Sequence, residues 1–128
     1  VLTSDTKHLV DASRFKQMKD SAVLINVSRG PIVQESALIE ALQTKKIAAA
    51  GLDVFETEPP ALDNPLFNLP NVTLAPHNIA WTDELAQGMG KSAFGSIKSI
   101  SRGEIPQFVV NKDVLDTPQF KAKIQRYR

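Results

Sequence analysis

The sequence predicts an α/β fold in which helices flank a parallel sheet, as in part of a doubly wound domain. Three short apolar runs are typical of buried strands: residues 22–27, 47–54 and 72–75. Segments with helical spacing precede, separate or follow these runs, and this order favours parallel strands with helices on the sheet faces. A doubly wound sheet has about six strands. We therefore expect this chain to form one part of a larger domain.

The three predicted strands differ in what bounds them. Residues 22–27 are apolar except for Asn26, and a run without alternation fits a strand that is covered on both faces. Gly30 and Pro31 end that segment. Residues 47–54 form the second run, and prolines bound the short third run at 72–75. Between the second and third strands, four prolines predict a loop over residues 56–71.

Two short helices are predicted at residues 11–19 and 35–45. Asp11 can cap the first helix, in which Phe15 and Met18 share one face. The second helix has leucines one turn apart and ends in lysines, whose positive charge complements the helix dipole.

A longer helix is predicted from Thr82, its capping residue, to about Ser101, and Gly103 ends it. Apolar residues recur at every fourth position: Leu85, Met89, Ala93 and Ile97. The glycines inside it indicate either close packing against another element or simple tolerance: Gly88, Gly90 and Gly95. After residue 111 the pattern is mixed, and its basic residues are expected on a solvated helix face: Lys121, Lys123, Arg126 and Arg128.

Composition excludes several classes of protein. The 128 residues include 15 Lys+Arg and 14 Asp+Glu, so there is no basic footprint for nucleic acid. The absence of cysteine excludes disulfides and thiolate metal sites, and it suits a cytoplasmic protein. The sequence contains no apolar run of about 20 residues for crossing a membrane, and its start does not have the pattern of a signal peptide. Because the first residue is not Met, we expect a fragment or a processed chain.

Polar side chains follow each predicted strand, at the edge where open α/β sheets bind ligands. Arg29 can grip a carboxylate through two parallel hydrogen bonds, although an arginine at that position is also common as a structural residue. His77 suits proton transfer near neutral pH, but on its own a loop histidine is more often structural. Asp53 ends an apolar strand, so its charge should have a partner, either backbone amides or a ligand amide.

Two further carboxylates and a second histidine lie near these positions in sequence. Either Glu56 or Glu58 could orient His77 and favour its protonated form. His8 lies in a polar leader beside Lys7, and no chemical role is expected for it. Two histidines far apart with no ligand spacing give little support for a metal site, so none is predicted.

Three motifs, in this order and spacing, resemble the D-isomer-specific 2-hydroxyacid dehydrogenases. They read NVSRGPIV at 26–33, GLDVFETEP at 51–59, and NPLFNLPNVTLAPH at 64–77. The resemblance runs from about Leu2 to about Arg102. It implies that residues 1–102 are part of a Rossmann-type NAD-binding domain, with 103–128 a tail that packs on the substrate domain.

The resemblance also implies residue roles. Arg29 would bind the substrate carboxylate, His77 would exchange a proton with the substrate oxygen, and Glu58, rather than Glu56, would pair with that histidine. Asp53 would hold the nicotinamide carboxamide. The residues expected to contact the cofactor are Leu2, Thr3, Val27, Ser28, Arg29, Asp53, His77 and Asn78. The cofactor would be NAD, with NADP not excluded, and it would supply the hydride that reduces a 2-keto acid to a D-2-hydroxy acid.

Some features depart from the family pattern. There is no G-x-G-x-x-G turn for a diphosphate and no substrate domain, so the chain is expected to be inactive alone. After His77 the sequence reads Asn78, Ile79, Ala80 and Trp81, a variant of the family pattern. The resemblance implies a homodimeric parent enzyme that acts on a small 2-keto or 2-hydroxy acid. An NAD(H)-binding corepressor of the same fold is the alternative.

Overall fold

The computed structural model describes residues 1–127, and contacts within it divide the chain into two compact units. The N-terminal unit spans residues 1–80, and the C-terminal unit comprises the rest of the chain. The division falls after Ala80, so the long helix that follows belongs to the C-terminal unit.

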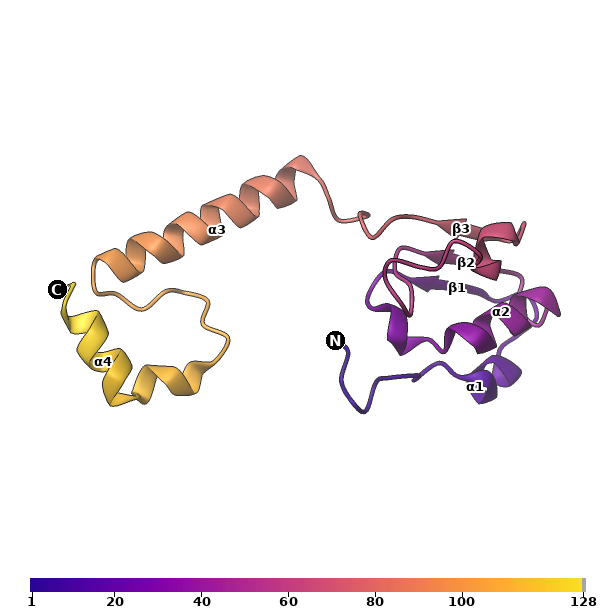
Figure 1. Cartoon of the computed structure of the whole chain (residues 1–128), viewed down its shortest axis with the longest axis horizontal. Helices are drawn as coiled ribbons and strands as arrows, with labels where there is room; N and C mark the ends of the chain where they lie inside the picture. The colour runs from indigo at the N-terminus through magenta and orange to yellow at the C-terminus, as the bar shows by residue number, and fades with distance from the viewer. Residues whose placement is uncertain (128) are drawn as a thin grey trace. The chain divides into compact units, whose positions relative to one another are not determined.

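A parallel sheet of three strands forms the centre of the N-terminal unit (Figure 1). The strands are β1 (Val23–Asn26), β2 (Ala49–Leu52) and β3 (Val72–Leu74), in the order β1-β2-β3. Gly51 of β2 is aligned with Ile25 on one side and with Thr73 on the other. The parallel α/β architecture expected from the sequence is therefore confirmed.

Two helices lie on one face of this sheet, α1 (Ala12–Gln17) and α2 (Glu35–Gln43) (Figure 1). Asp11 caps α1 as expected, because its Oδ1 accepts a hydrogen bond of 3.0 Å from Arg14 N. At the end of α2, Lys45 takes a left-handed φ of 57°. This turn lets Lys46 N donate to Ala41 O at 2.8 Å, which satisfies a carbonyl of the last helical turn.

The hydrophobic core lies between these helices and the sheet. Its fully buried side chains come from α1, α2 and the segments around the strands: Phe15, Leu38, Leu42, Ile47 and Leu66. Ala50 and Leu52 of β2 belong to this cluster, and partly buried residues of β1 and β3 pack against it: Leu24, Val72 and Leu74.

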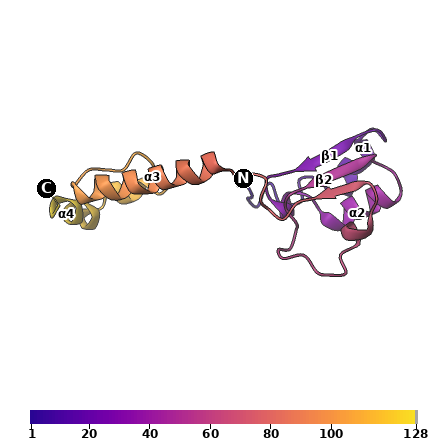
Figure 2. The same ribbon diagram turned by 90° about the horizontal axis from the view of Figure 1, so that it is seen from above.

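The opposite face of β1 is exposed, which corrects the expectation that this strand is covered on both faces. Val23, Ile25 and Val27 are 60%, 69% and 50% exposed, whereas Leu24 and Asn26 between them face the covered side. The reason is that α1 and α2 both contribute to the single core on the other side (Figure 2). Within residues 1–127, β1 is therefore covered on only one face of the sheet.

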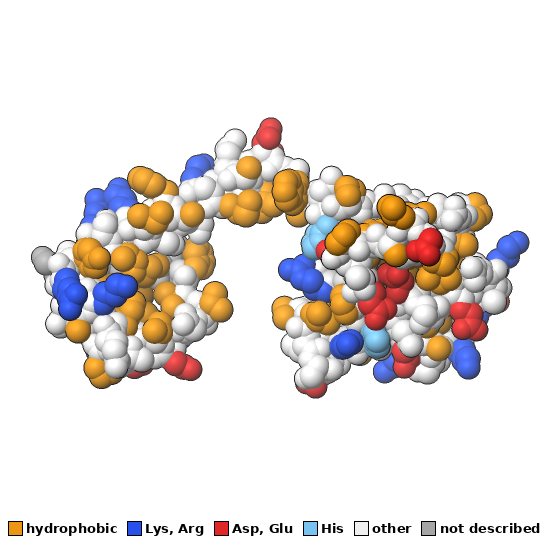
Figure 3. Space-filling view, viewed as in Figure 1, with side chains coloured by type: hydrophobic (Ala, Val, Ile, Leu, Met, Phe, Trp, Pro, Cys, Tyr) orange, Lys and Arg blue, Asp and Glu red, His pale blue; other side chains and the backbone are white. Residues whose placement is uncertain are grey.

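The C-terminal unit contains α3 (Asp83–Ser101) and α4 (Pro118–Gln125). Thr82 caps α3 through a 3.2 Å hydrogen bond from Leu85 N to its Oγ1, and Gly103 ends the helix with a φ of 69°, both as expected. No residue of α3 is buried, and apolar side chains are visible along it in Figure 3: Leu85, Met89, Phe94 and Ile97 are exposed.

The glycines of α3 make no close approach to other elements. A Cβ added at Gly88, Gly90 or Gly95 would meet no atom within 4 Å. Among the described residues, these glycines are therefore simply tolerated in the helix and do not serve close packing. The basic side chains of Lys121, Lys123 and Arg126 are exposed, as expected for a solvated face, and Arg128 lies outside the described residues. In the described part of the chain no helix is long and apolar enough to cross a membrane.

Replacement of Leu38 by Ala tests the position of the core. Leu38 is 1% exposed, so Leu38→Ala should lower the free energy of unfolding by about 2–5 kcal/mol. Leu62 is 99% exposed, and Leu62→Ala is the matched control that should change stability by less than about 0.5 kcal/mol. Urea denaturation followed by circular dichroism measures both. Equal effects of the two substitutions would contradict this core.

Candidate functional site

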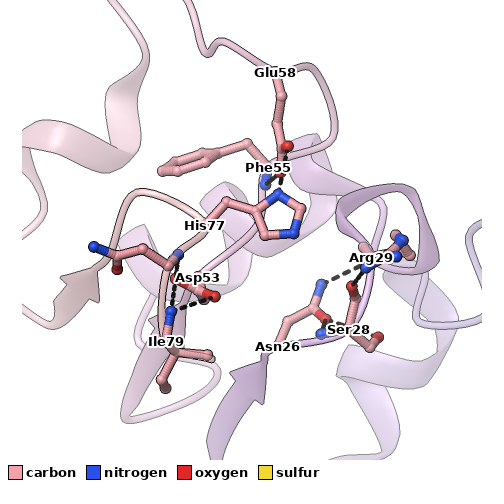
Figure 4. Close-up of polar contacts among 9 residues, drawn as sticks. Asn26, Ser28, Arg29, Asp53, Phe55, Glu58, His77 and Ile79 are labelled. Atoms are coloured by element: carbon pink, nitrogen blue, oxygen red, sulfur yellow. Dashed lines mark hydrogen bonds and ion pairs between the residues drawn. The ribbon is translucent and has the colours of Figure 1, made fainter. Parts of the chain in front are cut away.

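Three loops meet at the carboxyl ends of the parallel strands (Figure 4). They carry the polar residues that the sequence singles out: Arg29 after β1, Asp53 and Glu58 after β2, and His77 after β3. Parallel strands deliver their carboxyl ends to one edge, which explains why residues so far apart in sequence come together.

Glu58 and His77 form the central ion pair of this edge. Glu58 Oε2 lies 2.8 Å from His77 Nδ1, and Glu58 Oε1 accepts a 3.0 Å hydrogen bond from Phe55 N. The hydrogen bond to His77 and then the one from Phe55 N–H hold the pKa of Glu58 below its ordinary value. Glu58 therefore remains a carboxylate at neutral pH, with one oxygen beside the imidazole ring and the other bound to the backbone.

The His77 ring lies between Glu58 and the turn that carries Ser28 and Arg29 (Figure 4). With Nδ1 engaged by Glu58, Nε2 points towards that turn. His77 has a left-handed φ of 54°, which is uncommon for a residue other than glycine. The ring is thus oriented by one carboxylate and leaves its second nitrogen available at the sheet edge.

Asp53 holds the loop that carries His77. Its carboxylate is 3% exposed, and its Oδ1 accepts a 2.9 Å hydrogen bond from Asn78 N. Ile79 N donates to Oδ2 at 3.2 Å. Of the two partners that the sequence left open for Asp53, the structure provides backbone amides. These bonds fix the backbone directly after His77.

The turn that carries Arg29 is organised by Asn26, a residue to which the sequence analysis gave no role. Asn26 is 6% exposed, donates from Nδ2 to Arg29 O at 3.1 Å, and accepts from Ser28 N at 3.2 Å. The sequence position of Asn26 indicates this structural role, because a single amide at the end of an apolar strand needs hydrogen-bond partners. Arg29 itself is exposed, and its Nη1 donates to Ser28 O at 2.7 Å.

Gly30 brings the turn after β1 against the loop after β2. A Cβ at this position would lie 1.7 Å from Phe55 O and 2.6 Å from Glu56 N, so no side chain fits. The close contact sets the separation between the loop of Arg29 and the loop of Glu58. Glycine is needed here for space rather than for a positive φ.

Glu56 binds His8 rather than His77. Glu56 Oε1 lies 2.5 Å from His8 Nε2, and Oε2 accepts a 2.8 Å hydrogen bond from Glu35 N at the start of α2. Partial burial opposes its ionisation, but the bonds from Glu35 N–H and from His8 outweigh that effect and lower the pKa of Glu56. Of the two carboxylates that the sequence offered, the structure places Glu58 beside His77.

A largely apolar cavity of about 450 Å³ adjoins the ion pair. Glu58 and His77 contribute to its wall, and the other lining residues are Phe55, Pro59, Pro60, Phe67, Leu74, Ala75 and Pro76. The pair itself remains open to solvent, since the His77 and Glu58 side chains are 48% and 38% exposed.

The other residues expected to contact a cofactor lie in the N-terminal unit. Val27 and Ser28 follow β1 directly, and both are exposed. Leu2 is 39% exposed, and Thr3 N donates to Thr6 Oγ1 at 2.7 Å in the N-terminal segment. Among residues 1–127, no group of three His, Asp or Glu side chains could hold a metal ion.

Comparison with known proteins matches this arrangement to one family. The model of the D-isomer specific 2-hydroxyacid dehydrogenase NAD-binding domain matches residues 1–78, which include all three strands together with Arg29, Asp53, Glu58 and His77. This chain belongs to the D-isomer-specific 2-hydroxyacid dehydrogenases. The resemblance expected from the three motifs is confirmed.

Individual dehydrogenases and reductases of this family are similar over most of the chain. Glyoxylate/hydroxypyruvate reductase B of Escherichia coli O1:K1 / APEC is 45% identical over 115 residues, which are 90% of this chain and 36% of that protein. The NAD⁺-bound crystal structure of a Lactobacillus jensenii D-lactate dehydrogenase has 33% identity and a TM-score of 0.79, covering 86% of this chain and 37% of that one.

A third relative differs in its cofactor. The NADPH-dependent glyoxylate/hydroxypyruvate reductase of Sinorhizobium meliloti, solved with NADP and malonate, has 39% identity and a TM-score of 0.70. The match covers 76% of this chain and 30% of that one. The chain thus spans about a third of the length of its relatives, and those relatives include both NAD and NADP complexes.

Replacement of Gly30 tests the contact between the two loops. Gly30→Ala forces the Phe55 carbonyl to move, and it should lower the free energy of unfolding by about 1–3 kcal/mol, the usual cost of overpacking. Gly51→Ala is the control, because its Cβ would lie an ordinary 3.8 Å from Ile25 Cγ1. Urea denaturation compares the two variants, and a Gly30→Ala variant as stable as Gly51→Ala would refute the contact.

The lowered pKa of Glu56 predicts a pH dependence of stability. Because the folded pKa is below the ordinary value of 4.5, Glu56 adds stability that is fully present above pH 4.5 and lost as pH falls through the folded pKa. The difference in unfolding free energy between the chain and Glu56→Gln should therefore be larger at about pH 6 than at about pH 3. Denaturation at the two pH values measures it.

Glu40→Gln serves as the control for this pH dependence, since Glu40 is an exposed carboxylate on α2. The difference in unfolding free energy between Glu40→Gln and the unmodified chain should be nearly the same at both pH values. A difference for Glu56→Gln that does not change with pH would mean that the bonds to His8 and Glu35 do not stabilise the ionised form.

Proposed function

We propose that this chain carries the catalytic side chains of an NAD(P)-dependent D-2-hydroxyacid dehydrogenase, which interconverts a small 2-keto acid and its D-2-hydroxy acid. The observation that carries the proposal is the Glu58–His77 pair at 2.8 Å, with the second ring nitrogen directed towards the turn of Arg29 (Figure 4). An acid, its orienting carboxylate and a carboxylate-binding guanidinium are the groups that this reduction requires.

The proposed roles follow from the charges and positions of the three side chains. Protonated His77 donates from Nε2 to the carbonyl oxygen during reduction and recovers that proton during oxidation. Glu58 holds Nδ1 and stabilises the imidazolium. Arg29 binds the substrate carboxylate through its fork of N–H groups, of which one nitrogen also donates to Ser28 O. The same positive charge favours negative charge that develops on the reacting oxygen.

The residues at this edge fit the nicotinamide end of a dinucleotide, which supplies the hydride when bound. Val27 offers an exposed apolar side chain directly after β1, with Ser28 beside it. Asp53 is proposed to face the carboxamide, and it already fixes the adjacent backbone at Asn78. We propose Leu2 and Thr3 for the adenosine side. The relatives include NAD and NADP complexes, so both cofactors remain within the proposal.

The enzyme is favoured over an NAD(H)-binding corepressor of the same fold. The relatives are named as reductases and dehydrogenases, which supports the enzyme. The proposal places the complete enzyme in the cytoplasm as a homodimer. Within it, residues 1–102 belong to the NAD-binding domain, and 103–128 pack on the substrate domain.

Substitution of Arg29 by Lys in the complete enzyme tests substrate binding. Lysine keeps the charge but loses the bidentate fork, so kcat/KM for keto-acid reduction should fall. The fall should correspond to a loss of roughly 2–4 kcal/mol of transition-state stabilisation. Arg14 is a matched control, because Arg14→Lys changes an arginine on α1, away from the loops of the site. Steady-state kinetics with glyoxylate, hydroxypyruvate and pyruvate measure the effect. Native kinetics for Arg29→Lys would make this arginine structural.

Substitution of Glu58 by Gln tests the proton donor. The variant keeps the shape and a hydrogen bond but removes the charge that favours protonated His77. The basic limb of the kcat/KM profile for reduction should therefore move to lower pH, while oxidation of the hydroxy acid should tolerate low pH better. Profiles in both directions measure this change.

Glu40→Gln again provides a control carboxylate, and its pH profile should match that of the unmodified enzyme. A basic limb that stays in place in Glu58→Gln would show that another group, rather than Glu58, sets the protonation of His77.

A further inference from the structure

His8 joins the two loops that carry Arg29 and Glu58, although it lies outside the site. Its backbone N donates to Pro31 O at 2.8 Å, which attaches it to the turn that begins at Arg29. Its side-chain Nε2 lies 2.5 Å from Glu56 Oε1, two residues before Glu58. One residue near the start of the chain therefore contacts both loops.

Glu56 extends this connection to α2. Its Oε2 accepts from Glu35 N at 2.8 Å, and the carboxylate of Glu35 accepts in return from Glu56 N at 3.0 Å. Glu35 Oε1 also accepts from Asn64 Nδ2 at 2.7 Å. The backbone and side chain of Glu56 are thus bound on both sides, in a network of four side chains from distant segments of the sequence.

We propose that His8 and Glu56 are positioning residues for catalysis, which fix the 53–58 loop so that Glu58 meets His77. This inference rests on the proposed function. Neither residue touches His77 within the described residues, so both act through the loop.

The exposure of the groups involved supports this proposal. The Glu58 side chain is 38% exposed and is held by Phe55 N within the loop and by His77 outside it. The bond to Phe55 N depends on the shape of the loop, and the contact with His77 depends on where the loop lies. The side chains of His8 and Glu56 are 34% and 30% exposed, so their ion pair is partly shielded from water. A partly shielded and geometrically fixed pair stabilises a loop more than a fully exposed one does.

The distribution of charge in the space-filling view agrees with this arrangement. Pale blue histidine side chains are visible at two places on one face of the N-terminal unit, with red carboxylates between them (Figure 3). The charged groups that face Glu56 are His8 and Lys7 from the N-terminal segment, together with the Glu35 carboxylate on α2. The positive charges favour the ionised form of Glu56, which its two hydrogen bonds require.

Hydrogen exchange in this 128-residue chain tests the proposal without any activity. The reporter is the Phe55 amide, which donates to Glu58 Oε1. His8→Gly removes the imidazole and suits the φ of 54° at this position, and it should raise the exchange rate of Phe55 N–H by about tenfold. His8→Gln offers an amide N–H to Glu56 and should restore most of the protection.

Asp20→Ala is the matched control. It also removes one ion pair, the 2.7 Å contact between Asp20 and Lys46, but that pair lies away from the 53–58 loop. Phe55 exchange should not change in this variant. If His8→Gly does not fold, His8→Asn takes its place, because asparagine tolerates a left-handed φ and has a shorter side chain. Unchanged Phe55 protection in the folded variant would overturn the proposal.

Kinetics of the complete enzyme distinguish positioning from general stability. In His8→Gly, the basic limb of the reduction profile should move towards that of Glu58→Gln, with recovery in His8→Gln and no shift in Asp20→Ala. A limb that stays in place in His8→Gly would overturn the positioning role. If Arg29→Lys and Glu58→Gln both leave reduction unchanged, the proposed function fails, and Phe55 exchange still decides whether His8 fixes the loop.

Discussion

The close contact between Gly30 and the Phe55 carbonyl is the constraint on which the site depends. It sets how near the turn after β1 can come to the loop after β2, and no side chain larger than hydrogen fits between them. Arg29 precedes this contact by one residue, and Glu58 follows it by three. The backbone separation between Arg29 and Glu58 is therefore set by packing of the two loops, before any side-chain interaction contributes.

Hydrogen bonds from buried polar groups hold the remaining parts of this edge. Asn26 organises the first turn, and Asp53 holds the backbone that follows His77. Both residues are nearly inaccessible to solvent, so an unpaired polar group at either position would be costly. The backbone that carries the site is thus held at buried points, while the side chains of Arg29, Glu58 and His77 remain partly exposed.

Local patterns in the sequence predicted the elements well but not their surroundings. The caps Asp11 and Thr82, the end of α3 at Gly103 and the parallel order of strands follow from short-range chemistry, and they are confirmed. The exposed face of β1 could not be predicted, because Val23 and Ile25 have the same composition whether or not another layer covers them. The choice of Glu58 over Glu56 came from the family motif. The bonds of Glu56 to His8 and Glu35 depend on tertiary structure, which spacing alone does not reveal.

The left-handed backbone of His77 has a consequence for how this position can change. A φ of 54° disfavours an ordinary L-residue, whereas glycine adopts it readily and asparagine tolerates it. The side chain that we propose to transfer the proton therefore sits on a backbone that a chemically inert residue would fit at least as well. Glycine or asparagine at this position would suit the backbone but would remove the imidazole, so the role that we propose for His77 is compatible only with a less favourable backbone residue.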